Sequence, residues 1–335
     1  MSFRIRHFRI EDFRAFQGSH EFVFDADEDR HIELISGPNG SGKSTIIEAL
    51  ELCFFGDRNE DNLLPYVNRQ LVDEIEVDER VSAEIYVELF DSEKSKSIRI
   101  FREISTIKTP TGKRNVIEDP VVKARSEGEE WKTIQNPNEY LGKLIPADVR
   151  PFSFYDPEQT LGLDTWEEGH SYRELVERAR KLRNYAAHGM ELDDSASVDV
   201  SREYLRSVNQ SLSEMETQLA VDESEEYLTM DSLKSEGSLI SAGEKNLVSF
   251  ALILAAGELE GVDAPAIMDM PFARVDVETI DIMCDLLRDA SERQIIIVGS
   301  RQSVDQVMDE LGDAVASRHL LSAHEDGTAG VGKKI

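Results

Sequence analysis

Residues 37–45 read GPNGSGKST, a glycine-rich stretch from which, with its flanks, the fold class can be predicted. An apolar run, HIELIS, precedes it at 31–36 and predicts a buried strand. The residues that follow, IIEALELCFFG at 46–56, carry the apolar spacing of a helix. A glycine-rich loop between a strand and a helix turns its backbone N–H groups toward phosphate oxygens, and the helix N-terminus adds its dipole. The stretch therefore predicts a binding site for a nucleoside triphosphate.

The loop fits the pattern G-x-x-x-x-G-K-[ST], with Gly37, Gly42, Lys43 and Ser44 at its fixed positions. In this pattern the lysine reaches the β- and γ-phosphates, and the hydroxyl of the next residue ligates the metal. We therefore expect Lys43 to contact the phosphates of ATP and Ser44 to bind Mg²⁺. ATP and Mg²⁺ are the two cofactors that the sequence predicts.

Two segments of the second half complete this pattern. Residues 239–256, LISAGEKNLVSFALILAA, place a serine–glycine turn before helical apolar spacing, and Ser241 is expected to cap that helix. Its free N–H groups form a second anion site. In PAIMDMPFARVD, at 265–276, an apolar strand ends in Asp269 and a turn leads to Asp276. Asp269 is placed to hold Mg²⁺ through water.

Length and composition limit the number of domains and the class of protein that this chain can be. The chain has 335 residues, enough for one large or two medium domains, and its formal net charge is −30. It has no apolar run of the length that a membrane span needs, no signal-peptide core and only two cysteines, so we expect a soluble cytoplasmic protein without a disulfide framework. Its 13 Lys against 24 Arg and 67 acidic residues are typical of a halophile protein, although an ordinary acidic protein is the alternative.

Positive charge gathers locally despite the acidic total. Residues 91–125 carry nine Lys or Arg and five Asp or Glu, and 173–183 carry five and two. If the chain contacts the phosphates of double-stranded DNA, these stretches are the candidates, and binding should be non-specific and weakened by salt. A solvated strand face is an equally good interpretation for any single residue. The candidates are Lys94, Lys96, Arg99, Arg102, Lys108, Lys113 and Arg114.

These motifs together resemble a known family. GPNGSGKST, ISAGEKN and IMDMPFARVD are similar to the ABC-type heads of the SMC, RecN and RecF class of DNA-maintenance ATPases, as is the opening IRHFRIEDFRAFQGSHEF. More narrowly, LIPADVRPFSFYDPEQT and DMPFARVD resemble segments of the DndD family, the ATPase of DNA phosphorothioate modification. The resemblance covers roughly residues 1–60, 140–165 and 236–335.

The resemblance implies a composite ATP site, in which the signature turn of one copy covers the nucleotide bound by the P-loop of another. For the P-loop side it implies Arg14, Gly37, Asn39, Gly40, Ser41, Gly42, Lys43, Ser44 and Thr45. For the opposite side it implies Ser241, Gly243 and Glu244. The metal ligands that it implies are Ser44, Asp269 and Asp156, with Glu158 and Gln159 as alternatives to Asp156. The catalytic set that it implies is Lys43, Asp156, Gln159, Ser241, Asp269 and Asp276.

Two positions depart from the family pattern. Heads that hydrolyse ATP rapidly carry Glu directly after the metal-binding Asp, whereas this chain has Met270, which cannot accept a proton. The histidine that usually follows the last core strand is matched by Arg301. These changes predict a slow or partner-activated ATPase, with Asp276 or Glu278 as a partial substitute for the base. Arg274 and Arg301 could act as arginine fingers, but pairing with nearby carboxylates is the simpler interpretation.

The middle of the chain predicts a short helical hairpin. Apolar residues recur at heptad spacing over 175–186 and 205–219, with an acidic loop between them. The hairpin is either a coiled-coil stub or an amphipathic pair packed on the head, and longer arms are either naturally absent or were removed.

The fold class expected is α/β, a P-loop NTPase of the ABC/SMC head type with two lobes and a mixed sheet. Strands near 265–269 and 294–299 complete the sheet that begins at 31–36, so both halves of the chain build it. The domains expected are the first half of the head at 1–165, the hairpin at 166–225 and the second half of the head at 226–335.

The function expected is an ATP-dependent homodimer that acts on DNA. If the DndD resemblance holds, its partners are the sulfur-transfer proteins of phosphorothioation: a cysteine desulfurase, a sulfurtransferase and an iron–sulfur protein. A break-repair or recombination head and an anti-phage defence ATPase share the same ATP motifs. A transporter ATPase subunit fits less well, because such subunits retain the glutamate that Met270 replaces.

Overall fold

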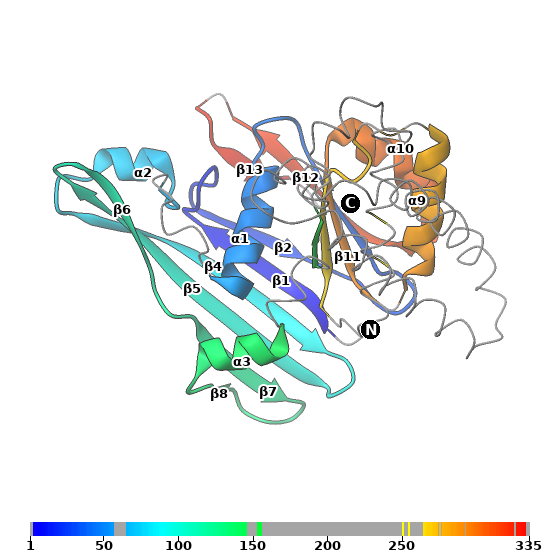
Figure 1. Cartoon of the computed structure of the whole chain (residues 1–335), viewed down its shortest axis with the longest axis horizontal. Coiled ribbons are helices and arrows are strands. Elements are labelled where there is room, and N and C mark those ends of the chain that lie inside the picture. The colour runs from blue at the N-terminus through cyan, green and yellow to red at the C-terminus, as the bar shows by residue number, and fades with distance from the viewer. Residues whose placement is uncertain are drawn as a thin grey trace, which may run out of the picture. The chain divides into compact units, whose positions relative to one another are not determined.

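The computed structural model in Figure 1 divides into two compact units. The first unit comprises Met1–Phe154, Asp263–Pro271 and Ser291–Ile335, and the second comprises Tyr155–Val262 and Phe272–Ala290. The residues that the structure describes are 3–56, 65–145, 153–155, 250, 254, 264–273, 275, 277–291, 293–324 and 326–332.

Strands of the N-terminal part form an antiparallel sheet in the first unit. Its order is β2-β1-β4-β5-β7-β8, and β6 pairs with β5. Alternation of apolar residues drives the long strands: Ala83, Ile85, Val87 and Leu89 are buried on one face of β4, as their spacing predicts. The strands are β1 (Phe3–Glu11), β2 (Ser19–Val23), β4 (Arg80–Asp91), β5 (Lys96–Thr109), β6 (Gly112–Ile117), β7 (Val121–Ser126) and β8 (Lys132–Thr133).

A second, mostly parallel sheet carries the strand that leads into the glycine-rich loop. Its order is β13-β12-β3-β11-β10-β9, and β10, β11, β3 and β12 run parallel to one another. Strands from both halves of the chain therefore build it, which confirms the mixed α/β fold. The strands are β3 (Ile32–Ser36), β9 (Phe154–Tyr155), β10 (Ala266–Asp269), β11 (Ile295–Gly299), β12 (Val315–Ala323) and β13 (Ala329–Val331).

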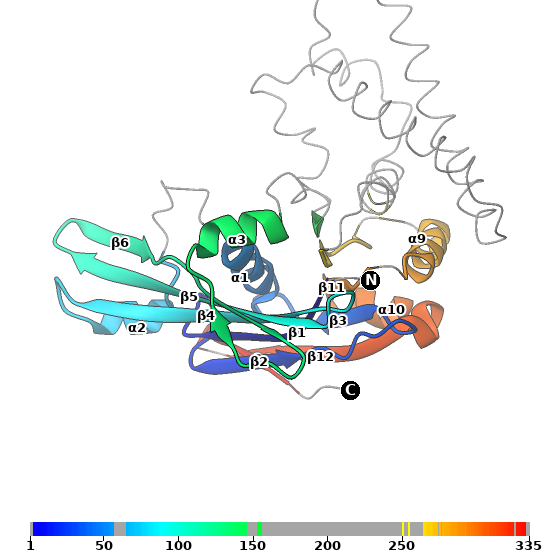
Figure 2. The same ribbon diagram turned by 90° about the horizontal axis from the view of Figure 1, so that it is seen from below.

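Helix α1 (Lys43–Phe55) lies on the antiparallel sheet beside α3 (Pro137–Leu144), and Figure 2 shows both on the same face of β4 and β5. Ile46, Ala49, Leu50 and Cys53 of α1 are buried at helical spacing. The other helices are α2 (Arg69–Glu74), α9 (Val277–Asp289) and α10 (Arg301–Leu311), followed by the 3-10 helix η3 (Gly312–Ala314). Among the described residues, no helix has the length and apolar character to cross a membrane.

The expected helical hairpin at 166–225, with both of its heptad runs, lies outside the described residues. Its boundaries therefore stay a prediction. Helix α9 of the second unit shows one buried apolar stripe, formed by Ile280, Met283, Cys284 and Leu287.

Candidate nucleotide-binding site

The glycine-rich loop connects the end of β3 to the start of α1, as its sequence predicts. Gly40 and Gly42 have φ angles of 78° and 83°, in the left-handed region that glycine adopts without strain. Gly42 is the N-cap residue of α1 and supplies no side chain to its first turn. The N-terminal N–H groups of α1 therefore have no side-chain cap, which leaves them suited to an anionic ligand.

Other residues of the chain pack closely against the loop at two glycines. A Cβ atom on Gly37 would lie 2.4 Å from Ser41 Oγ and 2.7 Å from Leu321 Cβ. A Cβ atom on Gly42 would lie 2.6 Å from the ring of Phe16. Strand β12 and the turn between β1 and β2, which contains Phe16, thus pack against the loop. A side chain at either glycine would displace the loop.

Lys43 is held inside this loop. Its Nζ donates hydrogen bonds to the carbonyl oxygens of Gly37, at 3.1 Å, and Pro38, at 2.8 Å. The residue is 8% exposed, and this burial lowers the pKa of its ammonium group, while the carboxylate of Asp269 acts in the opposite direction. The ammonium group is thus desolvated and bound to neutral carbonyls, which the more strongly attracting oxygens of a phosphate could replace.

Ser41 shows that the loop has unused hydrogen-bonding capacity. Its Oγ is buried and has no hydrogen-bond partner among the described residues. A buried hydroxyl without a partner costs free energy that a polar ligand can recover. Together with the uncapped first turn of α1 and the ammonium group of Lys43, this hydroxyl fits a phosphate-bearing ligand.

Asp269 ends β10 at the carboxyl edge of the parallel sheet, the edge from which the loop starts. It pairs in register with Val298 of β11, and Val298 pairs with Ile35 of β3. Ligands bind at this edge in open α/β sheets. Mg²⁺ commonly takes one or two protein oxygens and completes its shell with phosphate and water. The hydroxyl oxygen of Ser44, the second residue of α1, and the carboxylate of Asp269 are groups that would suit such an ion when a nucleotide is bound.

Met270, directly after Asp269, has an unusual backbone. Its φ angle is 42°, in the left-handed region, and its N–H donates to the carbonyl oxygen of Val298 at 2.7 Å. The residue is 39% exposed although it is large and apolar. Strained backbone of this kind clusters at functional sites. Arg301, the other departure from the family pattern, is exposed at the start of α10.

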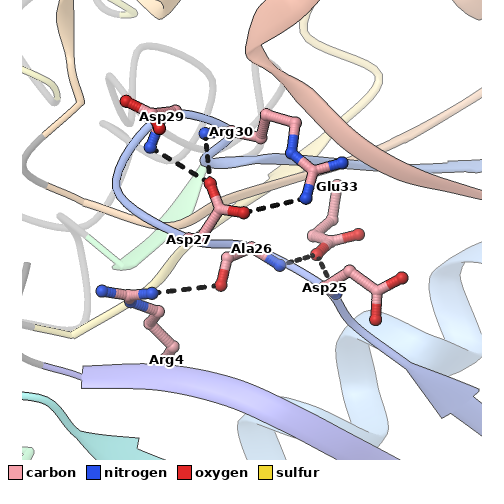
Figure 3. A network of polar contacts seen from close by, with 7 residues as sticks. All are labelled: Arg4, Asp25, Ala26, Asp27, Asp29, Arg30 and Glu33. Carbon is pink, nitrogen blue, oxygen red and sulfur yellow. Dashed lines mark hydrogen bonds and ion pairs between the residues drawn. The ribbon is translucent and has the colours of Figure 1, made fainter.

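A buried carboxylate in β3 anchors the chain that leads into the loop. Glu33 is fully buried and accepts hydrogen bonds from the backbone N–H groups of Asp25 and Ala26, both at 2.7 Å, and from the hydroxyl of Ser317 in β12. Arg4 adds a bond to the carbonyl oxygen of Ala26 at 3.2 Å (Figure 3). Glu33 thus ties β3 to β12 and to the segment before it.

Next to this anchor, Asp27 closes the turn before β3. Its carboxylate accepts from the N–H groups of Asp29 and Arg30 and pairs with the Arg30 guanidinium at 2.8 Å (Figure 3). The hydrogen bond from Arg30 lowers the pKa of Asp27. The sequence analysis missed this anchor; its signal is the single acid within the apolar run HIELIS.

Arg14 lies against α1. Its guanidinium contacts the carboxylate of Glu48, one turn after Ser44, with a shortest distance of 2.6 Å. The residues implied for the rest of the composite site lie outside the described part of the chain, so their roles stay predictions. These are Asp156, Glu158, Gln159, Ser241, Gly243, Glu244, Arg274 and Asp276, together with the side chain of Glu278.

Most of the basic candidates for DNA contact have partners within the protein. Lys94 pairs with Asp91 at 3.2 Å, and Lys113 pairs with Asp73 at 2.9 Å. Lys108 donates to the backbone carbonyl of Ile75 at 2.6 Å. These contacts favour the interpretation of a solvated, self-paired strand surface for these lysines.

The remaining candidates differ from one another. Lys96 donates to the hydroxyl of Tyr140 at 2.9 Å, and Arg114 is exposed. Arg99 forms an ion pair with Glu88. It also stacks on Trp131, with its guanidinium carbon 4.0 Å from the ring centre. Arg125 lies over the same ring at 4.6 Å. This stacked cluster was not expected from the sequence.

The assignment of Arg102 to the DNA-facing surface is wrong. Arg102 is 5% exposed and donates to the carbonyl oxygens of Cys53 and Glu118. Strand alternation gives the reason: Ile98, Ile100, Arg102 and Ile104 share one face of β5, which is buried. The same alternation in the sequence could have placed Arg102 inside.

The profile of the AAA_23 family, described as an AAA domain, matches residues 7–236, more than half of the chain. No curated protein matches the chain. Among solved structures, the SMC head domain from Thermotoga maritima is 17% identical, with a TM-score of 0.50 over 98% of both chains.

A second solved structure, the SmcHead bound to the C-winged helix domain of ScpA, is 14% identical. Its TM-score is 0.56, over 99% of this chain and 97% of that one. Identities this low show the fold alone. The chain belongs to the AAA_23 family of AAA domains, and its fold is that of an SMC head.

Proposed function

We propose that the chain is an ATP-dependent switch in which two copies close around bound nucleotide. The observation that carries the proposal is Lys43, desolvated and held on the carbonyl oxygens of its own loop, beside the uncapped start of α1. A nucleotide with three phosphates supplies oxygens for both groups. The turn at Ser241, Gly243 and Glu244 of the second copy then covers the γ-phosphate.

Within one copy, the residues act by charge and position. Lys43 exchanges its carbonyl partners for phosphate oxygens, and the N–H groups of the α1 terminus orient the phosphate chain. Ser44 and Asp269 would hold Mg²⁺, which neutralises phosphate charge when it is bound. ATP therefore supplies charge and contacts that are absent without it, and closure of two heads depends on it.

Hydrolysis is slow in this proposal. The position that follows Asp269 presents a thioether, which neither accepts a proton from water nor orients it. Asp276 or Glu278 would substitute for this base only in part. The binding of ATP, rather than its turnover, is then the event that sets the state of the head.

We further propose that the head serves DNA phosphorothioate modification in the cytoplasm, with the sulfur-transfer proteins of that system as partners. The support is the likeness of 144–160 and 269–276 to DndD segments. Contacts to double-stranded DNA would be to its backbone. Arg114 and Lys94 are exposed candidates, and Lys94 also pairs with Asp91. The low lysine content, with a net charge of −30, supports work at high salt, where such contacts are weak.

ATP binding to the Lys43→Ala variant tests the first step. Calorimetric titration with Mg-ATP should show binding to the wild-type protein and a loss of at least about a hundredfold in the variant, because charge-assisted contacts to phosphate are removed. Circular dichroism confirms that the variant is folded. Tight ATP binding by a folded Lys43→Ala protein would contradict the proposal that the loop binds the phosphates.

A further inference from the structure

Arg14 and Glu48 form a bidentate pair on the helix that carries the nucleotide site. Arg14 Nε donates to Glu48 Oε2 at 2.9 Å and Arg14 Nη2 to Glu48 Oε1 at 2.6 Å. Arg14 Nη1 donates to the carbonyl oxygen of Pro65 at 3.0 Å. Glu48 follows Ser44 by four residues, so it lies one turn further along the same face of α1.

The backbone of Arg14 is held as firmly as its side chain. Its φ angle is 51°, a left-handed conformation that is costly for a residue other than glycine. Its N–H donates to the carbonyl oxygen of Tyr66 at 2.8 Å, and its own carbonyl accepts from Asn68 Nδ2 at 2.9 Å. Tyr66 and Asn68 are both buried. Such strain persists only where the surroundings impose it, and it is typical of residues placed for function.

The guanidinium keeps capacity for a ligand. Its carbon lies 4.7 Å from the centre of the Tyr66 ring, and its side chain is 17% exposed. A guanidinium carries five N–H groups, and the bonds to Glu48 and Pro65 use three of them. Within the described part of the chain, these bonds leave two N–H groups that an anion can accept from.

We propose that Glu48 is a positioning residue of the nucleotide site, which fixes Arg14 so that its guanidinium meets the phosphates of ATP bound at the loop. The inference rests on the proposed function, since it needs ATP at this loop. Glu48 acts through Arg14 and does not itself contact the nucleotide. Preorganisation of this kind strengthens binding because the ligand does not have to order the side chain.

Simple electrostatics makes the opposite prediction, which gives a sharp test. A carboxylate one turn from a triphosphate repels it, so removal of that charge alone should tighten ATP binding. If Glu48 positions Arg14, the Glu48→Gln substitution should weaken ATP binding by about tenfold, the worth of one charge-assisted hydrogen bond. In an Arg14→Met background, the same substitution should cause no further weakening.

The experiment is a calorimetric titration of Mg-ATP into the full chain and its variants. Glu84→Gln is the matched control, because Glu84 also pairs with an arginine, Arg9, at 3.2 Å, but does so in the antiparallel sheet. This control should bind ATP like the wild type. Thermal melts followed by circular dichroism show which variants are folded. If Glu48→Gln does not fold, Glu48→Asp keeps the charge, shortens the reach and should weaken binding similarly.

The outcomes separate the two proposals. Unchanged or tighter ATP binding by folded Glu48→Gln, with the wild type binding normally, would overturn the positioning role and leave the ATP site intact. Equal weakening in the Arg14→Met background would overturn it too, because the effect would not pass through Arg14. A wild-type chain that binds no ATP would instead defeat the proposed function.

Discussion

The charged side chains of the two sheets in the first unit have different kinds of partner. On the antiparallel sheet, Lys94 and Arg99 pair with carboxylates of the same lobe, at 3.2 and 2.8 Å. At the carboxyl edge of the parallel sheet, Lys43 binds neutral carbonyls, and Ser41 Oγ is buried with no partner in the described part of the chain. Groups that lack a strong partner are the ones that a ligand can satisfy. Local geometry thus identifies the site better than a count of charges does.

Alanine in place of one glycine near each sheet should produce the largest difference in ATP binding. Gly42→Ala places a Cβ atom 2.6 Å from the Phe16 ring and imposes a left-handed backbone on a residue that avoids it. We expect loss of measurable ATP binding, at least about a hundredfold in calorimetry. Gly142, in α3 beside the antiparallel sheet, has open space around it. Gly142→Ala should leave ATP binding unchanged and stabilise the fold by about 0.5–1 kcal/mol in denaturant titration.

Equal effects of the two substitutions would mean that the loop is not the binding site. Loss of binding in Gly42→Ala through global unfolding would be recognised by circular dichroism. In that case a Phe16→Leu change in the same chain, which removes the ring that the Cβ atom meets, should restore the fold.

Substitution of Met270, at the carboxyl edge of the parallel sheet, should change the rate of ATP turnover. Met270→Glu should raise ATP turnover by about tenfold or more, because a placed carboxylate can act as general base. Met270→Gln is the matched control, since an amide of the same length cannot accept the proton at neutral pH. A phosphate-release assay measures both. Equal turnover in the two variants would contradict the missing-base explanation and direct attention to Arg301 or to an absent activator.

The smallest effect is expected for the basic candidates of the antiparallel sheet. Arg114→Gln should weaken binding to duplex DNA by only about two- to threefold, the share of one phosphate contact among several. Arg102→Met should leave DNA affinity unchanged, because the guanidinium is buried against the carbonyls of Cys53 and Glu118. Fluorescence anisotropy at two salt concentrations measures both. A larger loss for Arg102→Met would show that the buried face of β5 opens toward DNA.

Local patterns in the sequence predicted much of the fold. The loop at 37–45 lies between a buried strand and a helix, and the apolar alternation of β4 and the strand ending in Asp269 appear where expected. Each of these depends on residues close together in the chain. Period-2 and period-3.6 patterns report such local structure directly.

Features that depend on distant residues could not be predicted in the same way. Glu33 bonds Ser317, 284 residues away, and Arg14 bonds Glu48 and Pro65, 34 and 51 residues away. The partner of Lys113 is Asp73, forty residues away. No spacing rule in a single sequence gives these pairs. The sequence therefore suggested more unpaired basic side chains at 91–125 than the folded chain has.

The mass of the protein in solution, measured with and without Mg-ATP, tests whether two copies close around the nucleotide. Light scattering in molar salt should show 37.8 kDa without nucleotide and twice that mass with it. The Ser241→Arg variant should bind ATP yet remain at the single-chain mass, because its signature turn can no longer cover the phosphates of a partner. A wild-type chain that stays at 37.8 kDa while saturated with ATP would contradict the two-copy switch.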